Sequence, residues 1–194
     1  MFGAMQYWAK FLAANEGDEL SSIIVQKMNW SPPLSRLYKV NVDVVIFKDI
    51  RSTGIGIVIR DSLGQVAAVL CKKLEAPLSP LEAESKAFEA RILFSLSRGF
   101  TDVVLEGDSQ LLVNALAGSS SSPSVMASVI QGVLELCMGF TQIQFFHVKR
   151  QGNTPAHLVA KNVYSIVNDI VWVEEDLCLA KQALIHYVNF IFSN

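Results

Sequence analysis

Three closely spaced segments, in which side chains of different character alternate every second residue, constrain the fold of this chain most strongly. Residues 37–47, 54–60 and 65–72 each combine a two-residue alternation with the Val and Ile content typical of β-strands. A turn at Asp61–Gly64 separates the second segment from the third, and Gly64 suits a positive φ angle there. Because the connections are so short, the three segments are expected to form an antiparallel meander.

After residue 80 the spacing of apolar residues changes to that of a helix. Ala83, Ala87 and Phe94 belong to an apolar stripe over residues 80–98, which is expected to end at Gly99. Further elements are then predicted in sequence order: a strand at 101–106, helices at 109–117 and 124–138, a strand at 141–148, and a helix from 154 to about 167. A meander followed by alternating helices and strands predicts an α/β fold with a mixed sheet.

The length and composition allow one domain of ordinary size with short extensions. The chain has 194 residues, of which 51% are hydrophobic, so intrinsic disorder is excluded. No stretch of 18 residues lacks both charges and turn formers, so no membrane-spanning helix is expected. The Pro32–Pro33 pair marks the boundary between an N-terminal extension, residues 1–36, and a domain over 37–168. The C-terminal tail, 169–194, is expected to be helical near 176–190.

Charge and cysteine content narrow the possible functions. The net charge is −2, which excludes a strongly basic nucleic-acid-binding chain, and the acidic excess lies in the C-terminal tail. Residues 37–168 hold twelve basic and eleven acidic residues, which is close to balance. Cys71, Cys137 and Cys178 are far apart and lack zinc-ligand spacing, which indicates reduced thiols in an intracellular protein. Nucleus and cytoplasm are not distinguished.

Three acidic residues in or beside apolar elements are the candidates for chemistry. Asp43 interrupts the first strand, Glu84 lies in the first turns of the long helix, and Asp108 follows the strand at 101–106. Taken singly, each has an ordinary explanation: a solvent-facing strand position, a favourable helix dipole, or a helix cap formed by Asp108 or Ser109. Brought together at one end of the sheet, the carboxylates would repel one another unless a divalent cation such as Mg²⁺ neutralised them.

Five segments in the correct order resemble the type-1 ribonuclease H (RNase H) family: KVNVD at 39–43, GIGIVIRDSLG at 54–64, LEAESKAF at 81–88, VVLEGDSQ at 103–110 and HVKRQGNTPAHLVAK at 147–161. They are most similar to its plant branch, which is related to the RNase H domain of non-LTR retrotransposon reverse transcriptases. The lead-in Trp30–Pro33 is also typical of that branch. The resemblance implies an RNase H-like fold, with a five-stranded mixed sheet of order 3-2-1-4-5 and helices on both faces.

The resemblance also implies an activity and a site. The activity is metal-dependent endonucleolytic hydrolysis of the RNA strand of RNA–DNA hybrids, with two Mg²⁺ ions for which Mn²⁺ can substitute. No membrane association is implied, and the protein is expected to be a monomer. Carried over residue by residue, the catalytic, metal-binding positions are Asp43, Glu84, Asp108 and His157. The substrate-binding positions are Val44, Ser109, Arg150 and Asn153.

Three departures from the family pattern leave a second function open. Val44 replaces the usual Gly or Ala where the backbone lies close to the substrate, and His157 replaces a carboxylate. The loop at 149–153 is shorter than in bacterial relatives and lacks their mobile histidine, which predicts slower product release. The alternative is therefore a catalytically weak or inactive nucleic-acid-binding or scaffold protein of retroelement origin. The three acids favour the enzyme, whereas Val44 and the missing histidine favour the alternative.

Overall fold

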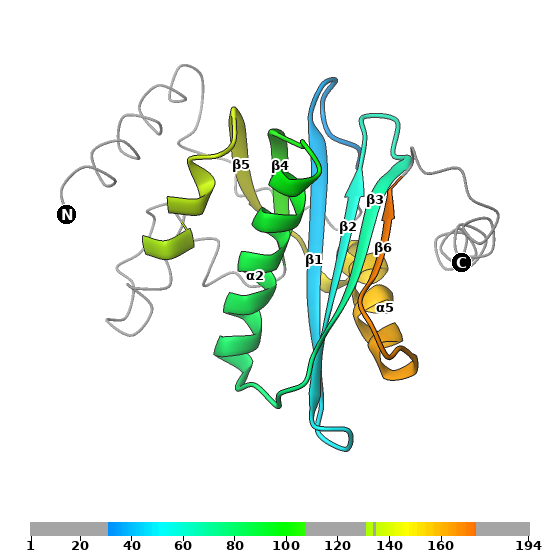
Figure 1. Cartoon of the computed structure of the whole chain (residues 1–194). Helices are drawn as coiled ribbons and strands as arrows, with labels where there is room; N and C mark the ends of the chain where they lie inside the picture. Colours follow the sequence, from blue (N-terminus) through cyan, green and yellow to red (C-terminus); the bar gives the residue numbers. More distant parts are fainter. Residues whose placement is uncertain (1–30, 108–130, 134, 174–194) are drawn as a thin grey trace.

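A six-stranded mixed sheet forms the centre of the molecule (Figure 1). The computed structural model describes residues 31–107, 131–133 and 135–173. The sheet order is β5-β4-β1-β2-β3-β6, in which β1, β2, β3 and β6 are antiparallel neighbours and β4 is parallel to both β1 and β5. The strands are β1 (Tyr38–Phe47), β2 (Ser52–Arg60), β3 (Val66–Leu74), β4 (Asp102–Gly107), β5 (Gln142–His147) and β6 (Ile170–Val173).

The first five strands confirm the order predicted from the sequence, and β6 adds a sixth strand beside β3. In the pairing of β6 with β3, Ile170 lies opposite Cys71. Asp169, the residue before β6, also binds to β3. Asp169 accepts a hydrogen bond from the backbone N–H of Lys73 at 2.8 Å and pairs with Lys72 Nζ at 3.0 Å. The sheet therefore continues beyond the 37–168 span expected for the domain. The helix expected near 176–190 lies outside the described residues.

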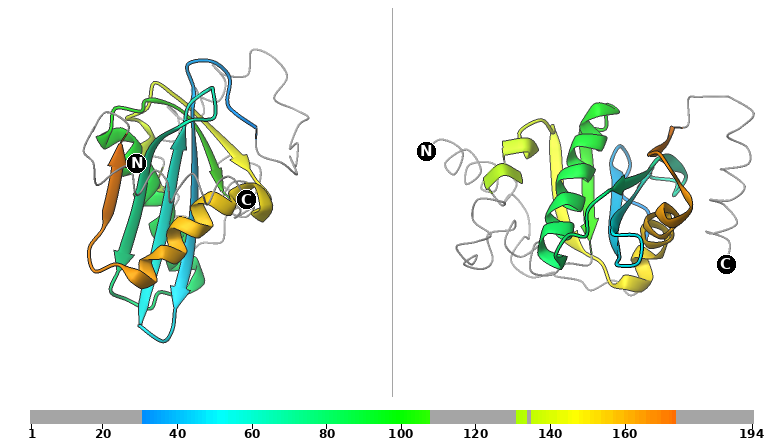
Figure 2. Two further views of the ribbon diagram at one scale, coloured as in Figure 1. Left: turned by 90° about the vertical axis from the view of Figure 1, so that its right-hand side faces the viewer. Right: turned by 60° about the horizontal axis from the view of Figure 1, so that its bottom comes forward.

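Two helices lie on opposite faces of the sheet (Figures 1 and 2). Helix α2 (Pro80–Ser97) begins with a capping box, in which Ser79 and Glu82 exchange hydrogen bonds, and Gly99 follows it with a φ of 77°. Helix α5 (Thr154–Asn162) is preceded by the 3₁₀-helix η1 (Arg150–Asn153) and followed by η2 (Val163–Ser165), so it is shorter than predicted. Residues 131–133 and 135–137 are helical, and the rest of the helices predicted at 109–117 and 124–138 lies outside the described residues.

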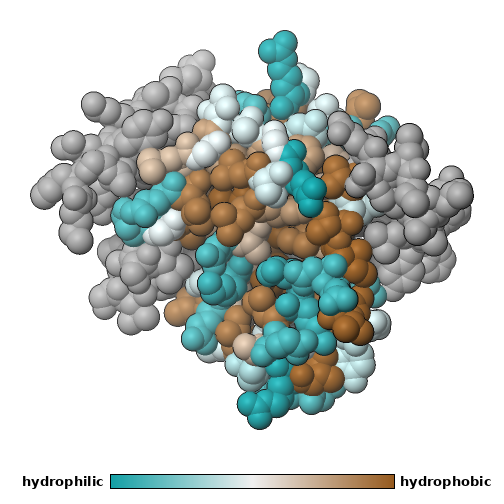
Figure 3. Space-filling model, in the orientation of Figure 1, coloured by the Kyte–Doolittle hydropathy of each residue, from teal (hydrophilic) through white to brown (hydrophobic). Residues whose placement is uncertain are grey.

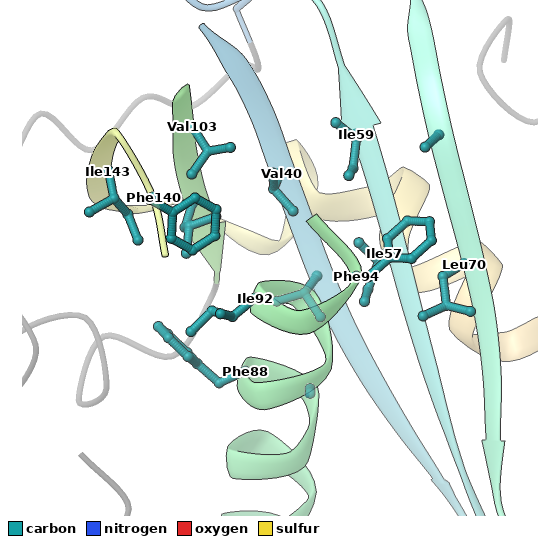
Figure 4. Packing of buried hydrophobic residues seen from close by; sticks show 14 of the residues in the cluster. Val40, Ile57, Ile59, Leu70, Phe88, Ile92, Phe94, Val103, Phe140 and Ile143 are labelled. Carbon is teal, nitrogen blue, oxygen red and sulfur yellow. The ribbon is translucent and has the colours of Figure 1, made fainter. Parts of the chain in front are cut away.

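Each face of the sheet has its own apolar core. Figure 4 shows the larger core, between the sheet and α2, where Phe88 and Ile92 face Val40, Val103 and Ile143. The smaller core, between the sheet and α5, is built from Val58, Val69, Cys71, Ala156, Val159, Val163 and Trp172. Because side chains alternate along a strand, β2 supplies residues to both cores. Trp172 is 9% exposed, which supports packing of this part of the tail onto the domain.

Helix α5 approaches β2 unusually closely because two glycines lie beneath it. A Cβ atom placed on Gly56 would lie 2.2 Å from the carbonyl oxygen of Ala156, and one on Gly54 would lie 2.3 Å from that of Ala160. Real Cβ atoms do not approach backbone atoms so closely, so a larger side chain at either position would force the helix away from the sheet. This close contact fixes the distance between α5 and the part of the sheet formed by β1 and β2.

The surface on the α2 side retains apolar area (Figure 3). Leu81 and Leu93 of α2 are 40% and 47% exposed. The high hydrophobic content of the chain is thus distributed between two filled cores and part of the surface. Among the described residues, no helix combines the length and apolarity required to traverse a bilayer.

Candidate functional site

Asp43 of β1 and His157 of α5 meet on the face of the sheet that α5 covers. Asp43 lies opposite Gly56 in the β1–β2 pairing, beneath the closest approach of the helix. Its Oδ2 is 2.6 Å from His157 Nδ1, and the two side chains are 5% and 26% exposed respectively. Asp43 is therefore not a solvent-facing strand residue. Of the four predicted metal-binding positions, the structure brings these two into direct contact.

Asn153 lies at the start of α5 and is fully buried. Its Nδ2 donates a 2.8 Å hydrogen bond to the backbone carbonyl of Val42, the residue before Asp43. Although Asn153 occupies the N-cap position of α5, its side chain makes no capping hydrogen bond to the helix. The amide group is thus directed into the fold, against β1.

A buried polar network continues along the same face of the sheet. Lys39 Nζ lies 2.8 Å from Glu106 Oε1, and Asn41 Nδ2 donates to Glu106 Oε2 at 3.0 Å. Arg60 Nη2 in turn donates to Asn41 Oδ1 at 3.0 Å. Lys39, Asn41 and Asp43 are alternate residues of β1, so the network is aligned with the candidate site. It connects β2, β1 and β4 in the stretch that leads to Asp43.

The charged members of this network are buried. Burial lowers the pKa of Arg60 to about 10, while the negative charge of Glu106 acts in the opposite direction. Arg60 remains protonated at neutral pH because this pKa is still well above 7. Glu106 thus interacts with both basic residues of the network, as the ion-pair partner of Lys39 and through its charge on Arg60.

Glu84 lies on α2, which covers the opposite face of the sheet from α5. It is partly buried and interacts electrostatically with Arg91, two helical turns further on. Arg91 is 1% exposed, donates from Nη1 to the carbonyl of Glu106 at 3.0 Å, and stacks on Phe88 at 3.6 Å. Burial lowers the pKa of Arg91 to about 9, and Glu84 opposes this shift. Arg91 thus links Glu84 to the carboxyl end of β4.

The remaining predicted residues divide into two groups. Val44 is half-buried and packs against the α2-side core, and Arg150 is exposed on η1. Asp108 and Ser109 directly follow β4 in sequence and lie outside the described residues. Within the ranges described, no three His, Cys, Asp or Glu side chains form a group that could hold a metal ion. The four-residue metal site therefore stays a prediction.

The two residues that do meet have donor atoms suited to a divalent cation. The Asp43 carboxylate supplies the hard oxygen ligands that Mg²⁺ prefers, whereas a neutral His157 imidazole supplies nitrogen, which Mn²⁺ accepts more readily. Because they come from a central strand and a helix in tight contact with it, their positions are held by the fold. The donor types of these two residues therefore suit a divalent metal, and Glu84 and Asp108 stay the further predicted ligands.

The fold and sequence together define the class of protein. The family model described as "Reverse transcriptase-like" matches residues 41–163, so the chain belongs to that family. The matched region extends from β1 to η2 and includes Asp43, Glu84 and His157. The RNase H type-1-like domain expected from the sequence is thereby confirmed. No curated protein matches the chain.

Solved structures of RNase H enzymes share the fold. The RNase H1 of the halophilic archaeon Halobacterium salinarum NRC-1 has a TM-score of 0.59 and 23% identity, with 66% of this chain and 98% of that chain covered. The N-terminal RNase H domain of a Mycobacterium tuberculosis protein has a TM-score of 0.58 and 19% identity, with coverages of 66% and 94%. LC11-RNase H1 in complex with an RNA/DNA hybrid has a TM-score of 0.57 and 18% identity, with 64% of this chain and 94% of that chain covered.

Proposed function

We propose that this protein is a metal-dependent RNase H that hydrolyses the RNA strand of RNA–DNA hybrids. The observation that carries the proposal is the contact between Asp43 and His157, two of the predicted metal-binding positions, 114 residues apart in sequence. Glu84 and Asp108 complete the proposed site. LC11-RNase H1, which shares the fold, has been solved with an RNA/DNA hybrid, and this supports the same class of substrate here.

The chemistry follows from the proposed ligands. Two Mg²⁺ or Mn²⁺ ions bound there would activate a water molecule and stabilise the leaving 3′ oxygen in an in-line displacement. Asp43 contributes a carboxylate held in a largely buried position, which restricts its orientation. His157 contributes an imidazole whose Nδ1 faces that carboxylate. The expected products are a 3′-hydroxyl and a 5′-phosphate.

Substrate binding on this chain would depend on few positive charges. Arg150 on η1 and Lys161 on α5 are exposed and flank His157 in sequence. Without Asp43, Glu84 and Asp108, the 37–168 span has twelve basic and eight acidic residues. This modest excess predicts weak hybrid binding that falls further as salt is added. Preference for RNA would come from 2′-hydroxyl contacts in the shallow minor groove.

The test is hydrolysis of a labelled RNA strand by the purified full-length chain. The RNA is presented in an RNA–DNA hybrid, in an RNA duplex and as a single strand, each with Mg²⁺, Mn²⁺ or EDTA. We expect cleavage within the hybrid only, dependent on metal and abolished by EDTA. Binding of the hybrid without cleavage in either metal would contradict the proposal. It would instead support the nucleic-acid-binding alternative.

His157→Asp is expected to shift the metal preference from Mn²⁺ towards Mg²⁺. A neutral imidazole is a poorer ligand for Mg²⁺ than a carboxylate, and it brings no negative charge to the site. The wild type should therefore show a higher ratio of Mn²⁺-supported to Mg²⁺-supported activity than the variant. The measurement is a titration of each metal for both proteins at fixed hybrid concentration. Equal ratios would show that His157 is not a metal ligand.

A further inference from the structure

Asn153 was expected at the substrate backbone, but its surroundings indicate a different use. The residue has no exposed surface, and its Nδ2 donates to the carbonyl of Val42 at 2.8 Å. Its Oδ1 is buried and has no hydrogen-bond partner among the described residues. Since an unsatisfied buried acceptor is costly, the hydrogen bond to Val42 has to offset that cost, and among the described residues it is the contact that fixes the orientation of the amide.

The backbone carbonyl that Asn153 contacts lies just beyond the end of a strand pairing. The pairing between β1 and β4 ends at Asn41, whereas the pairing between β1 and β2 continues to Phe47. Among the described residues, β1 therefore has a strand neighbour on one side only from Val42 onward. Buried backbone groups require partners, and Asn153 supplies one to β1 beyond the end of the β4 ladder.

Asn153 and His157 together contact two consecutive residues of β1. They are four residues apart at the start of α5, a spacing that places side chains on one face of a helix. Asn153 holds the carbonyl of Val42, and His157 lies 2.6 Å from the carboxylate of Asp43. The glycine contact beneath the same helix turn fixes the distance between α5 and the sheet.

We propose that Asn153 is a positioning residue that holds His157 in contact with Asp43, rather than a residue that binds substrate. Its role in hydrolysis rests on the proposed function, whereas its effect on the His157 ring does not. The start of α5 is attached to β1 at Val42, so a rotation or sliding of α5 that moved His157 would also break the Asn153 hydrogen bond. Loss of that bond would free the start of the helix to move relative to Asp43.

The experiment compares Asn153→Ala and Asn153→Asp with Thr154→Ala as the matched control. Thr154 lies in the same turn, is exposed, and donates to the carbonyl of Gln151 rather than to β1. Asn153→Asp keeps the size of the side chain but removes the donor. The first measurement is the histidine-ring region of a long-range ¹H–¹⁵N spectrum without metal. We expect the His157 signals to shift in both Asn153 variants and to stay unchanged in Thr154→Ala.

The second measurement is a double-mutant cycle with His157→Ala, assayed on the hybrid. Asn153→Ala should lower kcat by about 10-fold or more with little change in KM, as for other residues that orient metal ligands. The double variant should be no slower than the slower single variant, because both changes disable one contact. Unchanged His157 signals would overturn the proposal even if the chain cleaves no hybrid. Additive losses of activity in the double variant, or an effect confined to KM, would overturn the positioning role of Asn153 in hydrolysis. Either result would instead support substrate binding by Asn153.

Discussion

Asp43→Asn is expected to lower hybrid hydrolysis by at least about 1,000-fold, which corresponds to roughly 4 kcal/mol of transition-state stabilisation. The substitution keeps the shape of the side chain but removes the charge proposed to hold the metal ions. Because the Asp43 side chain is only 5% exposed, the fold should tolerate the neutral amide well. The melting temperature should therefore stay close to that of the wild type while activity is lost.

The control for this variant is Asp102→Asn, which makes the same chemical change at the first residue of β4. Asp102 begins that strand, whereas Glu106 and Gly107 at its far end lie toward the site. Initial rates and thermal melts of the two variants separate an effect of the site from a general effect of lost charge. If Asp43→Asn retained wild-type activity, the reaction would have to take place elsewhere on the chain.

Gly56→Ala is expected to lower the free energy of unfolding by about 3 kcal/mol or more. The added Cβ would lie 2.2 Å from the carbonyl oxygen of Ala156 and 2.4 Å from the backbone nitrogen of Ala160. Both are backbone atoms of α5, so the clash cannot be relieved by rotating a side chain. The helix must move away from the sheet, which would also separate His157 from Asp43.

Urea denaturation measures this effect, with Gly132→Ala as its control. Gly132 is helical, and a Cβ atom there would meet nothing within 4 Å. The control substitution should leave stability unchanged or raise it by up to about 1 kcal/mol, because alanine is the better helix former. A similar small effect at Gly56 would mean that α5 does not pack against β2 as closely as described.

Local sequence patterns predicted the first five strands and α2, but not how far each residue is buried. The alternation in 37–47 correctly places Lys39, Asn41 and Asp43 on one face of β1. The pattern could not show that this face is covered, since the cover is α5, more than 100 residues later in the chain. Likewise, nothing in the short segment 170–173 distinguished an edge strand from part of a tail, because its pairing with β3 is entirely non-local.

Arg91 and Asn153 show a second limit of sequence reasoning. Arg91 follows Ala83 and Ala87 at four-residue steps, so it continues the buried row of α2. The sequence does not indicate that Arg91 is buried, because charged residues are rarely buried and its contacts with Phe88 and the β4 carbonyl depend on tertiary packing. For Asn153, the family resemblance predicted that the residue belongs to the site but could not show that its side chain is buried, because burial depends on the fold.

The position of α5 and β6 late in the chain has a consequence for synthesis on the ribosome. The strands β1, β2 and β3 emerge first, and the face that α5 will cover then exposes glycines and apolar side chains beside the polar residues of β1. The open edge of β3 also lacks its neighbour until Ile170–Val173 has been made. A nascent chain at this stage presents both a bare apolar surface and an unpaired strand, the two features that promote association between incomplete chains. Slow translation of the segment that contains α5 and β6 would lengthen this exposure and increase dependence on chaperones.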